Sequence, residues 1–383
     1  MIYQVDTPPV GRLAPSPTGL LHLGNAWSFL LAWLGVRSHP SGRGRIILRQ
    51  EDIDPARSRQ EWMDGIERDL LWLGLDWDEG PHGSTVDGNC KLEAVQHGPY
   101  QQSLCCARYE AALASLAERD LVYPCYCTRK ELRELAGAPH GAHDGLGDAG
   151  AAYPGTCRQL SAEQRAEREA QGRRASLRLR CPDGEAGRES FTDLVLGPQS
   201  FTLTECGGDF ALRRSDGVWA YQLAVVADDI AMGVTQIVRG EDILLSTPRQ
   251  LLLWRLLGGT APAFAHIPLL HDAEGERLAK RHQSLSLAQL RESGAKPEAV
   301  VGWLATLAGL TPSARPLHPR DLAERLRSEG GMPWERLNTA EKLVVKGTLH
   351  HRYPKNGRWP VYERLARWPC CFRQHYSFFH RCC

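Results

Sequence analysis

Strand-like and helix-like hydrophobic patterns alternate along the first part of the chain. Residues 45–54 form a short apolar run that leads into an acidic stretch, which predicts a buried strand followed by a loop. Residues 26–33 are almost all apolar and predict a buried helix, whereas residues 58–75 have the spacing of an amphipathic helix. This order of elements favours a parallel α/β sheet with its site at the carboxyl ends of the strands.

The α/β pattern resumes only after a long interruption. Helical spacing covers residues 100–120, and a Gly-rich stretch at 137–150 predicts a loop. Short strand patterns follow, and residues 217–244 then supply apolar segments broken by acids. Strong helices are expected at 247–258 and 299–310. We therefore expect a split sheet, followed by a helical region.

The turn before the first apolar helix has an unusual composition. Residues 14–19 read APSPTG, in which proline fixes φ and glycine permits φ > 0, so a shaped turn is expected. His22 and Gly24 follow at the start of the helix, where backbone N–H groups attract anions. Taken alone, the stretch is equally typical of a loop-to-helix junction with an incidental histidine.

Composition narrows the class of protein. The chain has 383 residues, 42% of them hydrophobic and 24% charged, with a formal net charge of +1, which argues against a polybasic nucleic-acid binder. Neither a membrane span nor a signal-peptide pattern is found, so we expect a cytoplasmic protein without a membrane partner. We also expect a monomer. Its 12 cysteines then suggest metal binding, chemistry or burial, because cytoplasmic thiols stay reduced.

The last fifty residues differ from the rest. Residues 331–383 contain ten Lys or Arg, three Asp or Glu and nine aromatic residues, with two Cys-Cys doublets and little apolar periodicity. One interpretation is a basic, aromatic arm that binds nucleic acid. Another is a metal site made of Cys370, Cys371, His375 and His380 together with the last doublet, although two adjacent cysteines are a poor spacing for zinc ligands. The third, which we favour, is an extension without a dedicated fold.

Five segments, taken in order, resemble the glutamyl class I aminoacyl-tRNA synthetases. They are RLAPSPTGLLHLGN, LRQEDID, WAYQLAVVADDIAMGVTQIVRGED, VRGEDI, which overlaps its end, and GERLAKRHQSLSL. The first carries a HIGH-type motif at His22–Asn25, and the last a KMSKS-type loop at Arg277–Arg281. The resemblance spans residues 10–315 and implies a Rossmann-like α/β catalytic domain that activates an amino acid with ATP.

The implied chemistry agrees with the residue types. Attack of a carboxylate on the ATP α-phosphate builds charge on phosphate oxygens, which fixed donors and cations stabilise. The resemblance assigns His22, Gly24 and Lys280 to ATP, with His22 and Lys280 catalytic and Mg²⁺ bridging the phosphates. One departure is Ala279, where the family commonly has a serine.

The resemblance also implies a glutamate pocket. An arginine fork holds a carboxylate well, and an acid such as Glu51 suits the substrate ammonium. Arg239 favours glutamate over glutamine, because the related glutaminyl enzymes lack a cation there; a solvent-facing salt bridge is the alternative role. The implied glutamate-binding residues are Arg12, Leu13, Ala14, Pro15, Ser16, Glu51, Tyr221 and Arg239.

A structural zinc site is implied within the insertion. Cys125, Cys127, Tyr153 and Cys157 match the family's Cys-Cys-Tyr-Cys pattern, and four ligands close a structural Zn²⁺ site. Free buried cysteines beside an ordinary tyrosine are the alternative. With this assignment, the expected divisions of the chain are residues 1–98, the first half of the catalytic domain; 99–208, the zinc-bearing insertion; 209–256, the second half; 257–327, a helical domain with the KMSKS-like loop; and 328–383, the atypical tail.

The short region after Lys280 points to one branch of this family. Full-length glutamyl-tRNA synthetases carry a substantial anticodon-binding region there, so the chain is more similar to the glutamyl-Q tRNA(Asp) synthetases, a shortened paralogous group. That group implies tRNA-independent formation of glutamyl-adenylate and transfer of glutamate to queuosine in the anticodon loop of tRNA(Asp). A truncated ordinary glutamyl-tRNA synthetase is the alternative, and a non-catalytic zinc-stabilised tRNA-binding or regulatory module is the third interpretation.

Overall fold

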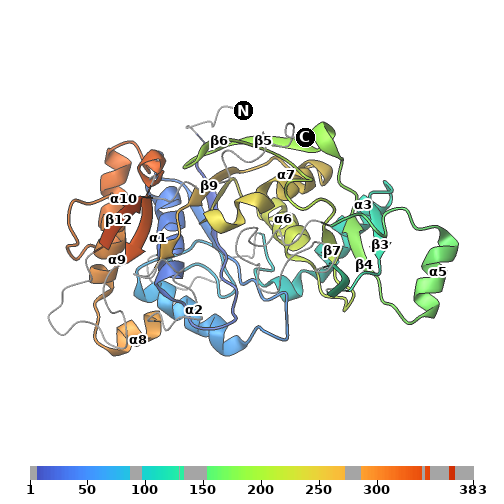
Figure 1. Ribbon diagram of the computed structural model, residues 1–383. Helices are drawn as coiled ribbons and strands as arrows, with labels where there is room; N and C mark the ends of the chain where they lie inside the picture. Colours follow the sequence, from blue (N-terminus) through green and yellow to red (C-terminus); the bar gives the residue numbers. More distant parts are fainter. Residues whose placement is uncertain are drawn as a thin grey trace.

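The computed structural model describes residues 7–86, 97–128, 130–132, 153–271 and 286–338, and the backbone of two later strands (Figure 1). Among the described residues, every helix is too short or too polar to span a bilayer. The α-helices are α1 (Leu23–Arg37), α2 (Gln60–Trp72), α3 (Cys106–Ala117), α5 (Ala162–Ala170), α6 (Tyr221–Ala231), α7 (Thr247–Leu256), α8 (Leu287–Glu292), α9 (Pro297–Leu307) and α10 (Pro319–Ser328). The strands are β1 (Val10–Leu13), β2 (Arg45–Leu48), β3 (Val122–Cys125), β4 (Ser176–Leu179), β5 (Arg188–Asp193), β6 (Gly197–Thr202), β7 (Ala211–Arg213), β8 (Gln236–Gly240), β9 (Ala263–Ile267), β10 (Leu270–His271), β11 (Glu341–Val345) and β12 (Tyr362–Ala366).

A parallel layer occupies the centre of the molecule. β1 pairs with β2 and β8 pairs with β9, both in parallel, and the N–H of Thr235 donates to the carbonyl of Val10 at 2.9 Å, which places β8 beside β1. Strands far apart in sequence therefore form one layer, as the split-sheet pattern predicts. The carboxyl ends of β1, β2 and β8 lie at the same edge.

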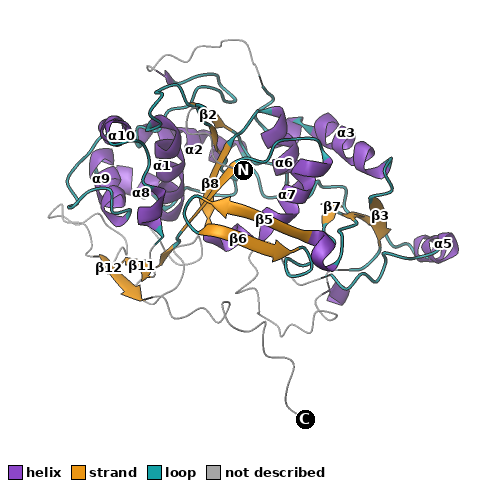
Figure 2. Cartoon of the chain, turned by 90° about the horizontal axis from the view of Figure 1, so that it is seen from above, coloured by secondary structure: helices purple, strands orange, loops and turns teal. Residues whose placement is uncertain are grey.

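The expected insertion also contributes to this layer. β5 and β6 form a hairpin within residues 99–208, and β5 pairs with β9 in parallel at Asp193 and Phe264. The remaining strands of that segment, β3 and β4, form a separate antiparallel sheet with β7. Seen from above, this small sheet and α5 lie at the opposite end of the molecule from α9 and α10 (Figure 2).

Helix α1 forms the centre of the main core. Leu23, Trp27, Leu30 and Leu34 are among its buried residues, and the helix is apolar nearly all round because it packs against β1 and β8 on one side and α10 on another. By contrast, α5 has no buried residue, in agreement with its charged sequence.

The region after residue 328 is not wholly without structure, since β11 pairs in parallel with β10 and in antiparallel with β12. The cysteine doublets of the tail lie outside the described residues.

Candidate active site and candidate metal site

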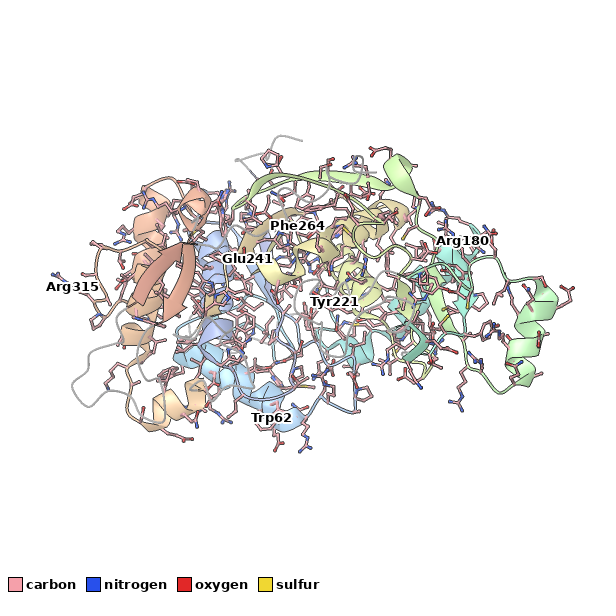
Figure 3. All side chains as sticks on the ribbon, in the orientation of Figure 1. Trp62, Arg180, Tyr221, Glu241, Phe264 and Arg315 are labelled. Carbon is pink, nitrogen blue, oxygen red and sulfur yellow. The ribbon has the colours of Figure 1, made fainter. Side chains whose placement is uncertain are left out.

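A cavity of about 560 Å³ lies at the carboxyl edge of the central strands, a size typical of small-molecule sites. Most of the residues that the sequence assigns to glutamate or ATP line it, and Tyr221 lies centrally in the molecule (Figure 3). These lining residues are Arg12, Ala14, Pro15, Ser16, His22, Gly24, Glu51, Tyr221 and Arg239. Leu13 is not among them, because its side chain is buried in the hydrophobic core behind β1. Lys280 lies outside the described residues.

The turn after β1 forms one wall of the cavity. The N–H of Thr18 donates to the carbonyl of Ser16 at 2.8 Å, and Gly19 has a φ of 153°, which only glycine adopts readily. The N–H of Glu51 donates to the carbonyl of Pro15 at 2.8 Å. This bond ties the turn to the segment after β2, so the two loops line the cavity together.

His22 caps α1 and fixes the geometry of the helix start. Its Nδ1 accepts from the N–H of Gly24 at 3.1 Å, while the N–H of His22 donates to Asn25 Oδ1 at 3.1 Å. A neutral ring that accepts at Nδ1 carries its proton on Nε2, so that atom is a donor. Since α1 has no acidic residue in its first turn, this end of the cavity favours an anion.

Both ends of the segment that contains the KMSKS-type loop lie at the cavity. Leu270, just before that segment, lines the cavity, and Ser286, just after it, forms an antiparallel bridge with His22. The N–H of Leu287 also donates to the carbonyl of Leu21 at 2.9 Å. Residues 272–285 themselves lie outside the described residues.

A buried charge cluster supports the acid that the sequence assigns to the substrate ammonium. Arg49 is fully buried, and its two Nη atoms contact Asp229 Oδ1 at 2.5 Å and Glu51 Oε1 at 3.0 Å. Arg12 Nε lies 3.7 Å from the same Asp229 oxygen. Burial raises the pKa of Glu51, although Arg49 and Arg12 act in the opposite direction. Arg49 and Asp229, which the sequence interpretation missed, lie behind the cavity wall.

Arg239 reaches the cavity from β8 and is only 5% exposed. It donates to neutral groups: Nε to His266 Nε2 at 3.1 Å, Nη1 to Gln250 Oε1 at 2.6 Å and Nη2 to Thr247 Oγ1 at 2.7 Å. No carboxylate among the described residues forms an ion pair with it, and burial lowers its pKa. A buried cation without a bound acid is costly, so this position favours an anionic ligand.

The expected metal ligands converge in the small sheet region. The sulfur atoms of Cys125, Cys127 and Cys157 lie within 4.8 Å of one another, and Cys127 Sγ is 3.6 Å from Cys157 Sγ. Tyr153 Oη lies 3.4 Å from Cys125 Sγ. Tetrahedral zinc with Zn–S bonds of about 2.3 Å holds its sulfurs roughly 3.7 Å apart, so this group could bind a metal ion.

Other residues missed by the sequence interpretation also surround the cavity. Asp242 lines it directly, and the side chains of His266, Thr247 and Gln250 hold Arg239 from behind. Asp242 lies in the quoted VRGEDI motif and could have been chosen from it. His266 carries no local signal, because only the pairing of β8 with β9 places it opposite Arg239.

The comparisons with known proteins all point to one family. The model of the tRNA synthetases class I (E and Q) catalytic domain matches residues 10–324. A solved glutamate tRNA ligase from Elizabethkingia meningosepticum has the same fold, with a TM-score of 0.68 and 24% identity over 92% of this chain and 68% of that one.

Curated relatives refine this assignment. The chain is 57% identical to glutamyl-Q tRNA(Asp) synthetase of Nitratidesulfovibrio vulgaris, over 88% of this chain and 98% of that protein. It is 52% identical to glutamyl-Q tRNA(Asp) synthetase of Symbiobacterium thermophilum, over 82% and 90%. Glutamate–tRNA ligase 2 of Alkalilimnicola ehrlichii is 44% identical, over 77% of this chain but only 58% of the ligase. The chain therefore belongs to the class I tRNA synthetases of the E and Q family, in the group of the glutamyl-Q tRNA(Asp) synthetases.

Proposed function

We propose that the protein activates L-glutamate with ATP, without tRNA, and transfers the glutamyl group from the adenylate to queuosine in the anticodon loop of tRNA(Asp). The observation that carries this proposal is Arg239, a buried cation on the cavity wall whose hydrogen-bond partners among the described residues are all neutral. Glu51 lines the same cavity with the opposite charge. Glutamate, with two carboxylates and one ammonium, complements such a pair.

Within the cavity, Arg239 would hold the side-chain carboxylate of glutamate and Glu51 its ammonium. Arg12 adds a second buried cation, and Nε of this residue has no hydrogen-bond partner among the described residues. Arg12, Ala14, Pro15, Ser16 and Tyr221, which line the cavity, would complete the wall around the substrate. Arg239 suits a carboxylate better than an amide, which would exclude glutamine.

ATP would lie toward the start of α1. The Nε2 donor of His22 and the backbone near Gly24 suit phosphate oxygens, and Mg²⁺ bound with ATP would offset part of the phosphate charge. Lys280 would complete the site, since Leu270, before the segment that carries it, lines the cavity, and Ser286, after that segment, pairs with His22. Catalysis would consist mainly of positioning and of charge stabilisation at the α-phosphate.

The acceptor separates the proposal from its main alternative. Transfer to a ring hydroxyl of queuosine would form an ester, whereas an ordinary glutamyl-tRNA synthetase charges the acceptor end of tRNA(Glu). The names of the two most similar relatives reported above support queuosine-bearing tRNA(Asp) as the partner. Because tRNA is a cytoplasmic molecule, we also propose the cytoplasm as the location of the protein. We further propose that the active form is a monomer.

The Cys125–Cys127–Cys157 cluster and Tyr153 would hold one structural Zn²⁺. Four ligands would leave no open position, so the ion would stabilise the small sheet region and take no part in the reaction. This proposal is supported by the chemistry of the three thiols and by their mutual distances.

Two measurements test the proposed activity. Glutamate-dependent ATP–pyrophosphate exchange without tRNA is expected, and exchange that requires tRNA(Glu) would favour the alternative. Labelled glutamate should then attach to tRNA(Asp) that contains queuosine, and mild alkali should release it from the ester. Label on the acceptor end of unmodified tRNA would contradict the proposal.

A further inference from the structure

A buried chain of hydrogen bonds lies behind Arg239. Asp193 Oδ2 is 2.6 Å from His266 Nδ1, and His266 Nε2 is 3.1 Å from Arg239 Nε and 3.0 Å from Thr247 Oγ1. His266 and Thr247 are fully buried, and Asp193 is 2% exposed. Of these four residues, Arg239 lines the cavity, so the other three would act through it. The chain crosses three neighbouring strands, β5, β9 and β8.

The hydrogen bonds determine which nitrogen of His266 carries the proton. A guanidinium N–H can only donate, so His266 Nε2 must accept from Arg239, and the proton of the neutral ring is on Nδ1. Asp193 Oδ2 accepts the hydrogen bond from this Nδ1–H. Burial lowers the pKa of His266 to about 4, and the nearby charge of Arg239 adds to this effect, so the ring is neutral at pH 7.

Asp193 is itself held in one orientation. Its Oδ1 accepts the N–H groups of Val195 and Leu196, both at 2.9 Å, and Oδ2 also accepts the N–H of His266 at 3.1 Å. Burial acts to raise the pKa of Asp193, but the bonds from His266 and from the backbone outweigh it, and the pKa is lowered. The carboxylate therefore stays ionised and cannot rotate without losing backbone hydrogen bonds.

We propose that His266 and Asp193 are positioning residues for glutamate recognition. Together they present a fixed acceptor to Arg239 Nε and thereby set the plane of the guanidinium. Each Nη atom then uses one N–H for Thr247 or Gln250 and keeps the other, which suits a bidentate bond to a carboxylate. The inference rests on the proposed function, because it takes the side-chain carboxylate of glutamate as the ligand of Arg239.

Two substitutions at His266 separate its acceptor from its donor. In His266→Gln the amide oxygen can take the place of Nε2, so an acceptor for Arg239 is kept. In His266→Asn the amide N–H can take the place of Nδ1–H toward Asp193, but the acceptor for Arg239 is lost. In glutamate-dependent ATP–pyrophosphate exchange, His266→Asn should raise the KM for glutamate on the order of tenfold to a hundredfold. His266→Gln should raise it much less, and the KM for ATP should change little in both.

Asp193→Asn tests the same inference by changing which nitrogen of His266 carries the proton. The amide oxygen is expected to replace Oδ1, which accepts two backbone N–H groups, so the amide N–H₂ faces His266 Nδ1. His266 must then accept at Nδ1 and carry its proton on Nε2, where it opposes the N–H of Arg239. The KM for glutamate should rise as in His266→Asn, and the preference for glutamate over glutamine should fall. In the background of His266→Gln, Asp193→Asn should add little to the KM.

Tyr123→Phe is the matched control. Tyr123 Oη donates to the buried Asp209 Oδ2 at 2.6 Å, the same length as the bond from His266 to Asp193, but neither residue lines the cavity. This variant should lower Tm without changing the KM for glutamate. If the wild-type protein shows exchange and His266→Asn, His266→Gln and Asp193→Asn change the KM values for glutamate and ATP equally, the inference is overturned. If the wild-type protein shows no exchange, the proposed function itself fails.

Discussion

The backbone of His22 pairs with that of Ser286 in an antiparallel bridge. This contact joins the start of α1 to the residue that follows the KMSKS-type segment. The two motifs are far apart in sequence, yet the bridge places the residue after that segment beside His22, and Leu270, before the segment, lines the same cavity as His22.

His22 combines a structural and a proposed catalytic role, which one pair of variants can separate. His22→Asn keeps a capping side chain for α1, whereas His22→Ala removes it and should cost about 1 kcal/mol of stability. Both variants lose the Nε2 donor, so ATP–pyrophosphate exchange should fall about 10²–10³-fold in each. Urea unfolding and the exchange assay measure the two effects. Near-normal exchange in His22→Asn would contradict the catalytic role.

Lys280→Ala should abolish detectable glutamyl-adenylate, since it removes the proposed cation at the departing pyrophosphate. The expected loss in exchange is on the order of 10²-fold or more, with the Tm nearly unchanged. Lys280→Arg keeps the charge but alters its geometry, and it should retain part of the activity. Full activity in Lys280→Ala would show that the lysine is a surface residue without a role in activation.

Arg49 holds two buried carboxylates, Glu51 and Asp229, and its removal should be strongly destabilising. Arg49→Leu leaves both acids without their shared cation and should cost about 3–5 kcal/mol, measured by urea unfolding at pH 7. Arg49→Lys keeps a charge but cannot contact both carboxylates through two separate nitrogen atoms, so its loss of stability should be smaller. A neutral effect of Arg49→Leu would mean that the cluster is solvated in solution.

The pH dependence of glutamate binding should follow Glu51. Burial raises the pKa of this carboxyl above its ordinary value of 4.5, while Arg49 and Arg12 oppose the shift. The ionised form binds the ammonium, so the KM for glutamate should rise as pH falls through the raised pKa. The stability that this group contributes is present below its unfolded pKa and is lost as pH rises through the folded one. In Arg49→Lys, the weaker contact should move the midpoint of the KM profile to higher pH, and an unmoved midpoint would assign it to another group.

The cysteine cluster should bind one metal ion per chain. Elemental analysis of the purified protein is expected to find one zinc, and Cys157→Ala should lose it and lower the Tm. Cys206→Ala removes a buried thiol outside the cluster and should keep the metal. Full zinc content in Cys157→Ala would exclude this group as the site.

Gly240 forms part of the cavity wall where no side chain fits. A Cβ atom there would clash with Asp242 Oδ1 and lie 2.8 Å from Leu269 Cδ2. Gly240→Ala should therefore displace the cavity wall and reduce activity more than stability. Gly65→Ala, inside α2 with open space around it, should instead stabilise the protein by about 0.5–1 kcal/mol with unchanged activity. Equal activity in the two variants would contradict the role of Gly240 in shaping the cavity wall.

The cavity residues differ in how far the sequence could reveal them. The turn after β1 and the cap of α1 are local, since residues 14–25 contain the prolines, the glycines and the capping His22 that make them. Arg49 and Asp229 could not be predicted, because their contact depends on how α6 packs against the segment after β2. Leu13, expected at the substrate, instead faces the core, because that choice is made by packing on β1 and not by its neighbours in sequence.

By itself the sequence determined the α/β class, the main helices and the order of motifs, because hydrophobic periodicity and turn residues act over short distances along the chain. Only the tertiary structure decided that Asp193, His266 and Arg239 form one buried chain. Those residues lie on three strands whose neighbours and register depend on the packing of the whole sheet. The hairpin of β5 and β6 thus supplies, through Asp193, a carboxylate that supports the cavity from behind.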